Sequence, residues 1–113
     1  MEETGKLDRG DGVRLAFARL SGRGPVVVFC PGYNSDMSGS KATALAELCA
    51  LHGQAYLRFD YLGHGRSSGE FSKGTIGRWR DDALAVLEEL TNGTQILVGS
   101  SMGGWIALLL ARQ

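Results

Sequence analysis

The chain lacks several features that would point to common classes of protein. Its twelve basic and twelve acidic residues cancel, so no excess of positive charge indicates binding to nucleic acid or to an anionic membrane. No apolar run approaches the roughly 20 residues that a helix needs to cross a bilayer. Internal repeats, low-complexity tracts and linkers are also missing. A length of 113 residues without such features predicts one globular domain.

Cysteine is scarce, and the N-terminus lacks a recognisable targeting signal. Cys30 and Cys49 have neither CxxC nor zinc-ligand spacing, so we expect two buried free thiols in a reducing compartment, and no metal site. Residues 1–6 are charged and have no apolar core, which argues against a secretory signal. The same segment is too acidic for a typical mitochondrial presequence. We therefore expect a cytoplasmic protein.

Glycine, by contrast, is abundant, because its 17 residues are about twice the usual share. Gly10-Asp11-Gly12 predicts a hairpin turn between strands at residues 4–8 and 13–20. A second turn is expected at residues 21–24. The continuous apolar and β-branched run at residues 26–30 is typical of a strand that is buried on both faces.

Two later segments have helical spacing. Residues 40–52 carry an apolar stripe, which consists of Ala42, Leu45, Ala46 and Cys49. Residues 76–90 are amphipathic, and Thr75 is placed to cap them. We assign Asp82 to the exposed polar face of this second helix, together with Arg78, Arg80, Asp81, Glu88 and Glu89. With strands at 55–59 and before Gly99, the order β-β-β-α-β-α-β-α predicts an α/β fold with a mainly parallel sheet.

The most specific pattern is Gly-x-Ser-x-Gly, in which Ser101 lies between Gly99 and Gly103. An apolar strand precedes it and an apolar helix without a polar face follows it. So sharp a turn predicts a strained, positive φ at Ser101, and a Cβ at either glycine would collide with the crossing backbone. We predict that Ser101 is a nucleophile. A helix-capping role is the alternative, but it would not explain both glycines.

Three motifs, in this order, resemble the N-terminal half of the α/β-hydrolases over residues 11–113. They are Cys30-Pro31-Gly32-Tyr33, the glycine-rich loop at residues 60–67, and the turn at residues 99–103. Residues 31–39, 58–61, 79–80 and 95–101 are similar to the palmitoyl-protein thioesterase and acyl-glucuronide esterase branch. The resemblance implies that residues 1–113 form one partial domain, a mainly parallel sheet with flanking helices that is truncated after the turn.

The resemblance also implies a function. It implies a serine hydrolase that cleaves acyl esters or thioesters through an acyl-enzyme at Ser101, and that acts on a small-molecule or acylated substrate without a cofactor. The backbone N–H groups of Tyr33 and Met102 would form the oxyanion hole. Acyltransferases, haloperoxidases and dehalogenase-like hydrolases share the fold, although a serine at this turn argues against haloalkane and epoxide chemistry.

One part of the family pattern is missing, because no Asp, Glu or His follows Ser101. The family places its acid and its base after the nucleophile, so we expect a structural role for His64 and loop-binding for Asp60. We expect the acid and base beyond Gln113, and this chain alone to be inactive. The alternative is a non-catalytic truncated fragment, pseudoenzyme or binding module. The strand before Ser101 would be an exposed sheet edge, which favours association.

Overall fold

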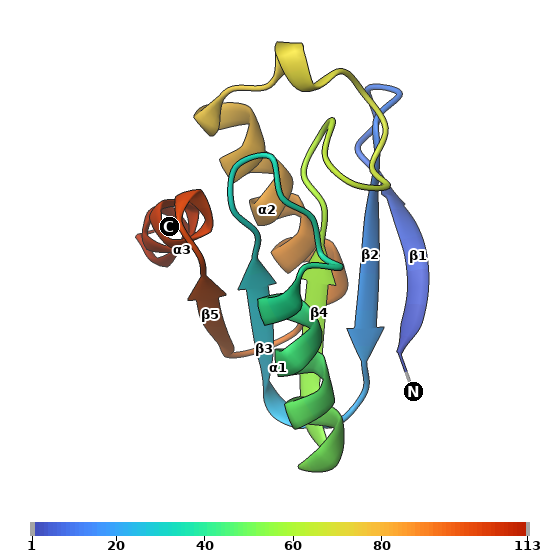
Figure 1. The fold of residues 1–113 in the computed structure, drawn as a ribbon, viewed down its shortest axis with the longest axis vertical. Helices are drawn as coiled ribbons and strands as arrows, with labels where there is room; N and C mark the ends of the chain where they lie inside the picture. The colour runs from blue at the N-terminus through green and yellow to red at the C-terminus, as the bar shows by residue number, and fades with distance from the viewer. Residues whose placement is uncertain (1, 113) are drawn as a thin grey trace.

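A computed structural model of the chain describes residues 2–112 and contains a sheet with helices on both faces (Figure 1). In chain order the elements are β1 (Glu3–Asp8), β2 (Arg14–Leu20), β3 (Arg23–Cys30), α1 (Ser40–Leu51), β4 (Gln54–Phe59), the 3-10 helix η1 (Phe71–Lys73), α2 (Ile76–Leu90), β5 (Gln95–Gly99) and α3 (Met102–Ala111). The predicted order of strands and α-helices is confirmed. The boundaries agree to within one residue except at the start of β3, where Arg23 pairs with Gln54 and therefore extends the strand into the expected turn.

The sheet has the strand order β1-β2-β4-β3-β5. Strand β3 pairs in parallel with β4 and with β5, whereas β2 pairs in antiparallel fashion with β1 and β4. The α/β fold class is confirmed, with a mixed sheet in which three parallel strands are followed on one side by an antiparallel hairpin. Because β4, β3 and β5 run in one direction, the loops that follow them meet at one end of the sheet (Figure 1).

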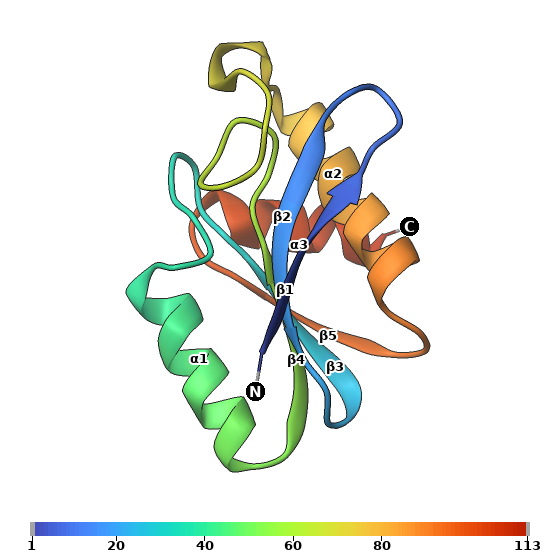
Figure 2. The ribbon, with the colours of Figure 1, turned by 90° about the vertical axis from the view of Figure 1, so that its right-hand side faces the viewer.

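Helices cover the two faces of the sheet unequally. Helix α1 lies on one face, and α2 and α3 lie on the other (Figure 2). Successive side chains of a strand point to opposite faces, so Val27 and Phe29 pack beneath α1, while Val28 and Cys30 pack beneath α2 and α3. All four are buried, which confirms that β3 is a strand covered on both sides.

Helix α2 begins as its sequence predicts. Thr75 is the N-cap, and its side-chain oxygen accepts a hydrogen bond from the Arg78 N–H at 3.1 Å. An N-cap of this kind satisfies one of the N–H groups that the first turn of a helix leaves unpaired. The buried face of the helix contains Trp79, Ala83, Val86 and Leu87.

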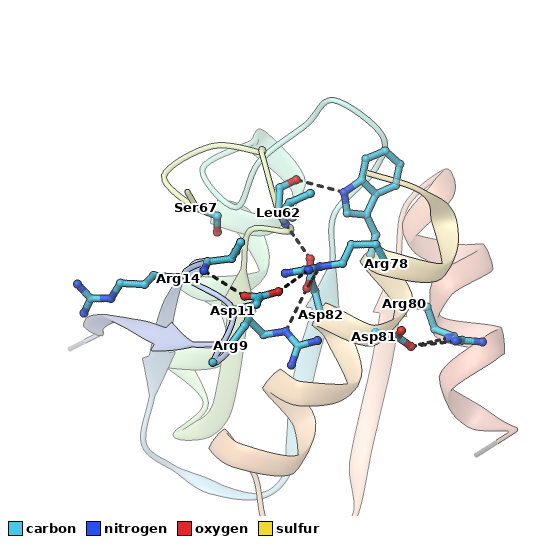
Figure 3. A network of polar contacts seen from close by, with 12 residues as sticks. Arg9, Asp11, Arg14, Leu62, Ser67, Arg78, Arg80, Asp81 and Asp82 are labelled. Carbon is cyan, nitrogen blue, oxygen red and sulfur yellow. Dashed lines mark hydrogen bonds and ion pairs between the residues drawn. The ribbon is translucent and has the colours of Figure 1, made fainter. Parts of the chain in front are cut away.

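Asp82 departs from the predicted polar face of α2, because its side chain is fully buried (Figure 3). Its Oδ1 accepts hydrogen bonds from Arg78 Nε at 2.9 Å and from Arg9 Nε at 3.2 Å. Its Oδ2 accepts from the Leu62 N–H at 2.8 Å. Buried charges occur where such partners replace water, so Asp82 ties α2 to the end of β1 and to the loop after β4. Asp81 forms an exposed ion pair, as expected.

Apolar side chains are exposed around β5, which lies at one edge of the sheet in the described part of the chain. Ile96 on β5 is 46% exposed, and Trp105 and Leu108 on α3 are 56% and 69% exposed. Association through this edge stays a prediction. Within residues 2–112, no helix combines the length and apolar character that crossing a membrane requires.

Candidate functional site

The chain reverses sharply between β5 and α3, at the end of the sheet where the parallel strands finish (Figure 1). Ser101 occupies this turn with φ 58° and ψ −122°, a conformation that residues other than glycine rarely adopt. The predicted positive φ is therefore confirmed. Ser101 is exposed, and Met102 begins the helix directly after it. The hydroxyl thus lies at the N-terminus of α3, where the helix dipole favours negative charge.

Two glycines make the turn sterically allowed. A Cβ on Gly99 would overlap the backbone of Gly103, and a Cβ on Gly103 would overlap the carbonyl group of Cys30. Gly104 is different, because a Cβ there would meet its nearest atom, the oxygen of Gly99, at 3.8 Å. The predicted need for glycine on both sides of Ser101 is confirmed, because Gly99 lies close against Gly103 within the turn and Gly103 lies close against the end of β3.

The loop after β3 brings Gly32, the residue before Tyr33, into contact with this turn. A Cβ on Gly32 would lie 3.1 Å from the oxygen of Ser100 and 3.5 Å from Ser101 Cβ, so loop and turn are in contact. Of the residues that the structure describes, none accepts a hydrogen bond from the N–H of Tyr33 or of Met102. Free backbone donors beside a nucleophile are the elements of an oxyanion hole. That these two donors act together stays a prediction.

Two open hollows adjoin the turn. One, of about 270 Å³, is lined by residues that include Gly32, Ser35, Lys41 and Ser100. The other, of about 600 Å³, is lined by residues that include Leu45, Leu48, Val98 and Ser101. Lys41 on α1 borders both, and its Nζ donates to Ser100 Oγ at 3.2 Å. Lys41 could not be predicted at this site from the sequence, because no motif connects it with a serine 59 residues away.

Asp60 and His64 have the structural roles that the sequence predicts. Asp60 is 1% exposed, and its two oxygens accept from the Met37 N–H at 2.7 Å and the Arg66 N–H at 3.0 Å. Burial raises the pKa of Asp60, and these two donors oppose the rise. His64 accepts a hydrogen bond from the Asn34 N–H at 3.1 Å. A base must have a free nitrogen, so this contact argues against His64 as the base for Ser101.

Within residues 2–112, the cysteines and the other possible metal ligands form no further candidate site. In residues 2–112, no three or more His, Cys, Asp or Glu side chains are grouped so that they could hold a metal ion. Cys30 and Cys49 are free and buried, as predicted. Burial raises the pKa of Cys30 to about 12, so its thiol stays neutral and poorly reactive.

Known proteins share both the sequence and the fold of this chain. A family model described as the alpha/beta hydrolase fold matches residues 25–113. Bovine "Palmitoyl-protein thioesterase ABHD10, mitochondrial" is 50% identical over 100 residues, which make up 88% of this chain and 33% of that protein. Mouse alpha/beta hydrolase domain-containing protein 10 superposes with a TM-score of 0.93 at 46% identity, over 96% of this chain and 44% of that structure. A putative hydrolase from Agrobacterium vitis S4 superposes with a TM-score of 0.88 at 41% identity, over 99% of this chain and 44% of that structure.

These relatives are longer than this chain, and their names correct the expected cellular location. The chain spans about a third of the length of the curated relatives it matches. The bovine, mouse and rat relatives are all named mitochondrial, so the expected cytoplasmic location is wrong. That expectation rested on the acidic character of residues 1–6. In the structure Glu3–Asp8 form strand β1, so most of this segment belongs to the folded sheet and carries no information on targeting.

Proposed function

Because this chain belongs to the alpha/beta hydrolase fold family, we propose that it supplies the nucleophile and oxyanion hole of a serine hydrolase acting on acyl esters or thioesters. The observation that carries the proposal is the exposed Ser101, held at positive φ at the N-terminus of α3. A capping serine needs no such strain, whereas a nucleophile at a strand-to-helix turn does.

The substrate class follows from the relatives' names. Those relatives are named palmitoyl-protein thioesterases and are 47–50% identical to this chain, so we assign an acyl thioester as the first substrate to test. The open, largely apolar hollow beside Ser101 is compatible with an acyl chain. We also extend the relatives' mitochondrial location to this protein.

The chemistry has two steps. Ser101 Oγ attacks the acyl carbonyl carbon while its proton passes to a base, and the leaving group departs with that proton as a thiol or alcohol. Water then attacks the acyl-enzyme, which releases the free acid and restores the Ser101 hydroxyl. In both steps the carbonyl oxygen becomes an anion. The N–H groups of Tyr33 and Met102 are the donors that we assign to this anion. Removal of one such donor typically lowers the rate by about 10²–10³.

A serine hydroxyl needs a base, and we place that base outside this chain. Family order puts an acid and then a histidine after the nucleophile, and the sequence after Ser101 contains no Asp, Glu or His. His64 comes earlier, and its Nε2 already accepts the Asn34 N–H. Because the curated relatives are about three times as long, we assign the acid and the base to sequence beyond Gln113.

A non-catalytic role, as a truncated fragment, pseudoenzyme or binding module, is favoured by the same missing acid and base. The coding sequence downstream of Gln113 separates the two hypotheses. An Asp followed by a His, each after a further strand, within about 150 residues supports the enzyme. A stop codon at this point in the native transcript supports the fragment.

The direct test is labelling by a fluorophosphonate probe, which reacts with activated serines. The protein is expressed with its downstream sequence, and Ser101→Ala is compared with Ser100→Ala. Ser100 is the matched control because it is the neighbouring serine and its Oγ accepts a hydrogen bond from Lys41, so the same substitution is made without removing the proposed nucleophile. We expect the wild type and Ser100→Ala to label and Ser101→Ala to remain unlabelled. The proposal is wrong if the wild type does not label, or if Ser101→Ala labels equally.

A further inference from the structure

Two loops at the carboxyl ends of neighbouring strands are joined by side-chain hydrogen bonds. We call residues 31–37, after β3, the β3 loop, and residues 60–67, after β4, the β4 loop. Tyr61 Oη of the β4 loop donates to the oxygen of Pro31 at 2.9 Å. Asp60 Oδ1 accepts from the Met37 N–H at 2.7 Å. These bonds hold the β3 loop at its first and last residues, and His64 contacts it between them.

His64 is bound through both ring nitrogens. The Asn34 N–H donates to Nε2 at 3.1 Å, so Nε2 carries no proton. The single proton of the neutral ring is then on Nδ1, which lies 3.0 Å from the oxygen of Leu62. The His64 side of both bonds is shielded, because His64 is only 3% exposed, although Asn34 itself is exposed. The rings of Phe71 and Trp79 pack against the imidazole, each with a centroid distance of 5.0 Å. This packing fixes the orientation of the ring.

The residue that His64 holds lies in the turn that carries the Tyr33 N–H. The Ser35 N–H donates to the oxygen of Gly32 at 3.2 Å, which closes a four-residue turn with Tyr33 and Asn34 at its centre. Asn34 has φ 55°, a conformation that carries strain in most residues other than glycine.

Two neighbouring peptide planes of this turn are therefore held. The Tyr33 N–H shares its plane with the Gly32 carbonyl, which accepts from Ser35. The next plane is held by the bond from Asn34 to His64. Together the two bonds fix the direction in which the Tyr33 N–H points.

We propose that His64 is a positioning residue for the oxyanion hole: its Nε2 holds the Asn34 N–H and so keeps the Tyr33 N–H directed toward the site of the developing anion. This inference rests on the proposed function. His64 does not touch the substrate, and it acts only through the β3 loop. The alternative is that His64 merely fills space among the surrounding aromatic rings.

Two substitutions separate these roles, because they differ in which ring nitrogen they replace. In His64→Gln the side-chain oxygen reaches the position of Nε2 and accepts from Asn34. In His64→Asn the shorter side chain reaches only the position of Nδ1, so the acceptor for Asn34 is lost. The matched control is His52→Asn, because His52 is exposed at the end of α1.

The assay is thioester hydrolysis by the protein with its downstream sequence, with kcat and KM measured separately. We expect His64→Asn to lower kcat by about 10- to 100-fold, because a misplaced donor costs less than a removed one. KM should change by less than about threefold, since an oxyanion donor acts mainly in the transition state. His64→Gln should restore kcat to within about threefold of the wild type, and His52→Asn should leave it unchanged. An unchanged kcat in His64→Asn, or an equal loss in both variants, would overturn the proposal.

A second measurement needs no turnover. The ¹⁵N chemical shifts of His64 in the wild-type protein report which nitrogen carries the proton. We expect protonated Nδ1 and unprotonated Nε2, and the opposite tautomer would overturn the proposal even if His64→Asn failed to fold. Failure of the proposed function has a different signature, because the wild type would then neither label with fluorophosphonate nor hydrolyse thioesters.

Discussion

Substitution of Asp82 by Asn should destabilise the protein strongly, although it preserves the size and shape of the side chain. Asp82 is fully buried, and its partners are Arg9, Arg78 and the Leu62 N–H (Figure 3). An amide has only one oxygen for these donors. Whichever way it turns, its NH₂ group faces either the guanidinium groups or the backbone N–H. The substitution therefore removes a charge and also places one donor against another.

The expected loss can be worked from these bonds. A hydrogen bond to a charged group contributes about 1.5–3 kcal/mol, whereas a bond between neutral groups contributes about 0.5–1.5 kcal/mol. A buried donor that is left without an acceptor costs about 1–3 kcal/mol. Arg9 and Arg78 have side chains that are 22% and 25% exposed, so water compensates part of the loss. We expect the free energy of unfolding of Asp82→Asn to fall by about 3–5 kcal/mol, as when one partner of a buried pair is removed.

The assay is urea unfolding of the protein with its downstream sequence, followed by circular dichroism. The neighbouring Asp81→Asn is the matched control, since Asp81 and Arg80 have side chains that are 50% and 37% exposed. Exposed pairs contribute about 0–1 kcal/mol, so this variant should remain within about 1 kcal/mol of the wild type. If the two variants lose equal stability, the burial argument for Asp82 is wrong.

Two further predictions concern the turn and the thiols. Gly103→Ala should unfold the protein or lower its stability by several kcal/mol, because its Cβ would overlap the Cys30 carbonyl. Gly104→Ala, whose Cβ would make only an ordinary contact at 3.8 Å, should be neutral or stabilising by up to about 1 kcal/mol in the same urea assay. Iodoacetamide at pH 8 should modify neither Cys30 nor Cys49 before urea is added, because burial raises both thiol pKa values, that of Cys30 to about 12. The raised pKa of Cys30 also makes the folded state sensitive to alkali, because the thiol of the unfolded chain ionises first. The free energy of unfolding is unaffected below the ordinary thiol pKa and falls as the pH rises from there toward 12. Rapid native alkylation of either thiol, detected by mass spectrometry, would contradict the burial argument.

The helices and strands could be predicted because their signals are local. The apolar spacing of residues 40–52 and the cap at Thr75 depend on residues within a few positions of one another. The burial of Asp82 could not be predicted in the same way. One of its partners, Arg78, is four residues away, and a pair at this spacing is typical of an exposed helix face. Its other side-chain partner, Arg9, is 73 residues away and joins it only through the tertiary fold.

In the candidate site, too, the local features could be predicted from the sequence and the features that depend on the tertiary fold could not. The strained turn at Ser101 was predictable, because glycines two positions before and after it indicate a close backbone approach. The lack of an acceptor for the Tyr33 N–H within residues 2–112 was not predictable. It depends on how the β3 loop packs against the β4 loop, through bonds between residues about 20–30 positions apart. The catalytic roles of Ser101, Tyr33 and Met102 stay predictions.

The two halves of the proposed site are held by different forces, and this decides how each responds to mutation. Backbone contacts hold the turn at Ser101, where the absence of a Cβ at Gly99 and Gly103 permits the packing. A substitution at either glycine therefore threatens the fold itself. Side-chain hydrogen bonds from the β4 loop hold the β3 loop instead. Substitution of His64 thus removes one contact from a loop that Tyr61 and Asp60 still hold at both ends. Activity should then fall further than stability when His64 is substituted, whereas a substitution at Gly99 or Gly103 should lower both.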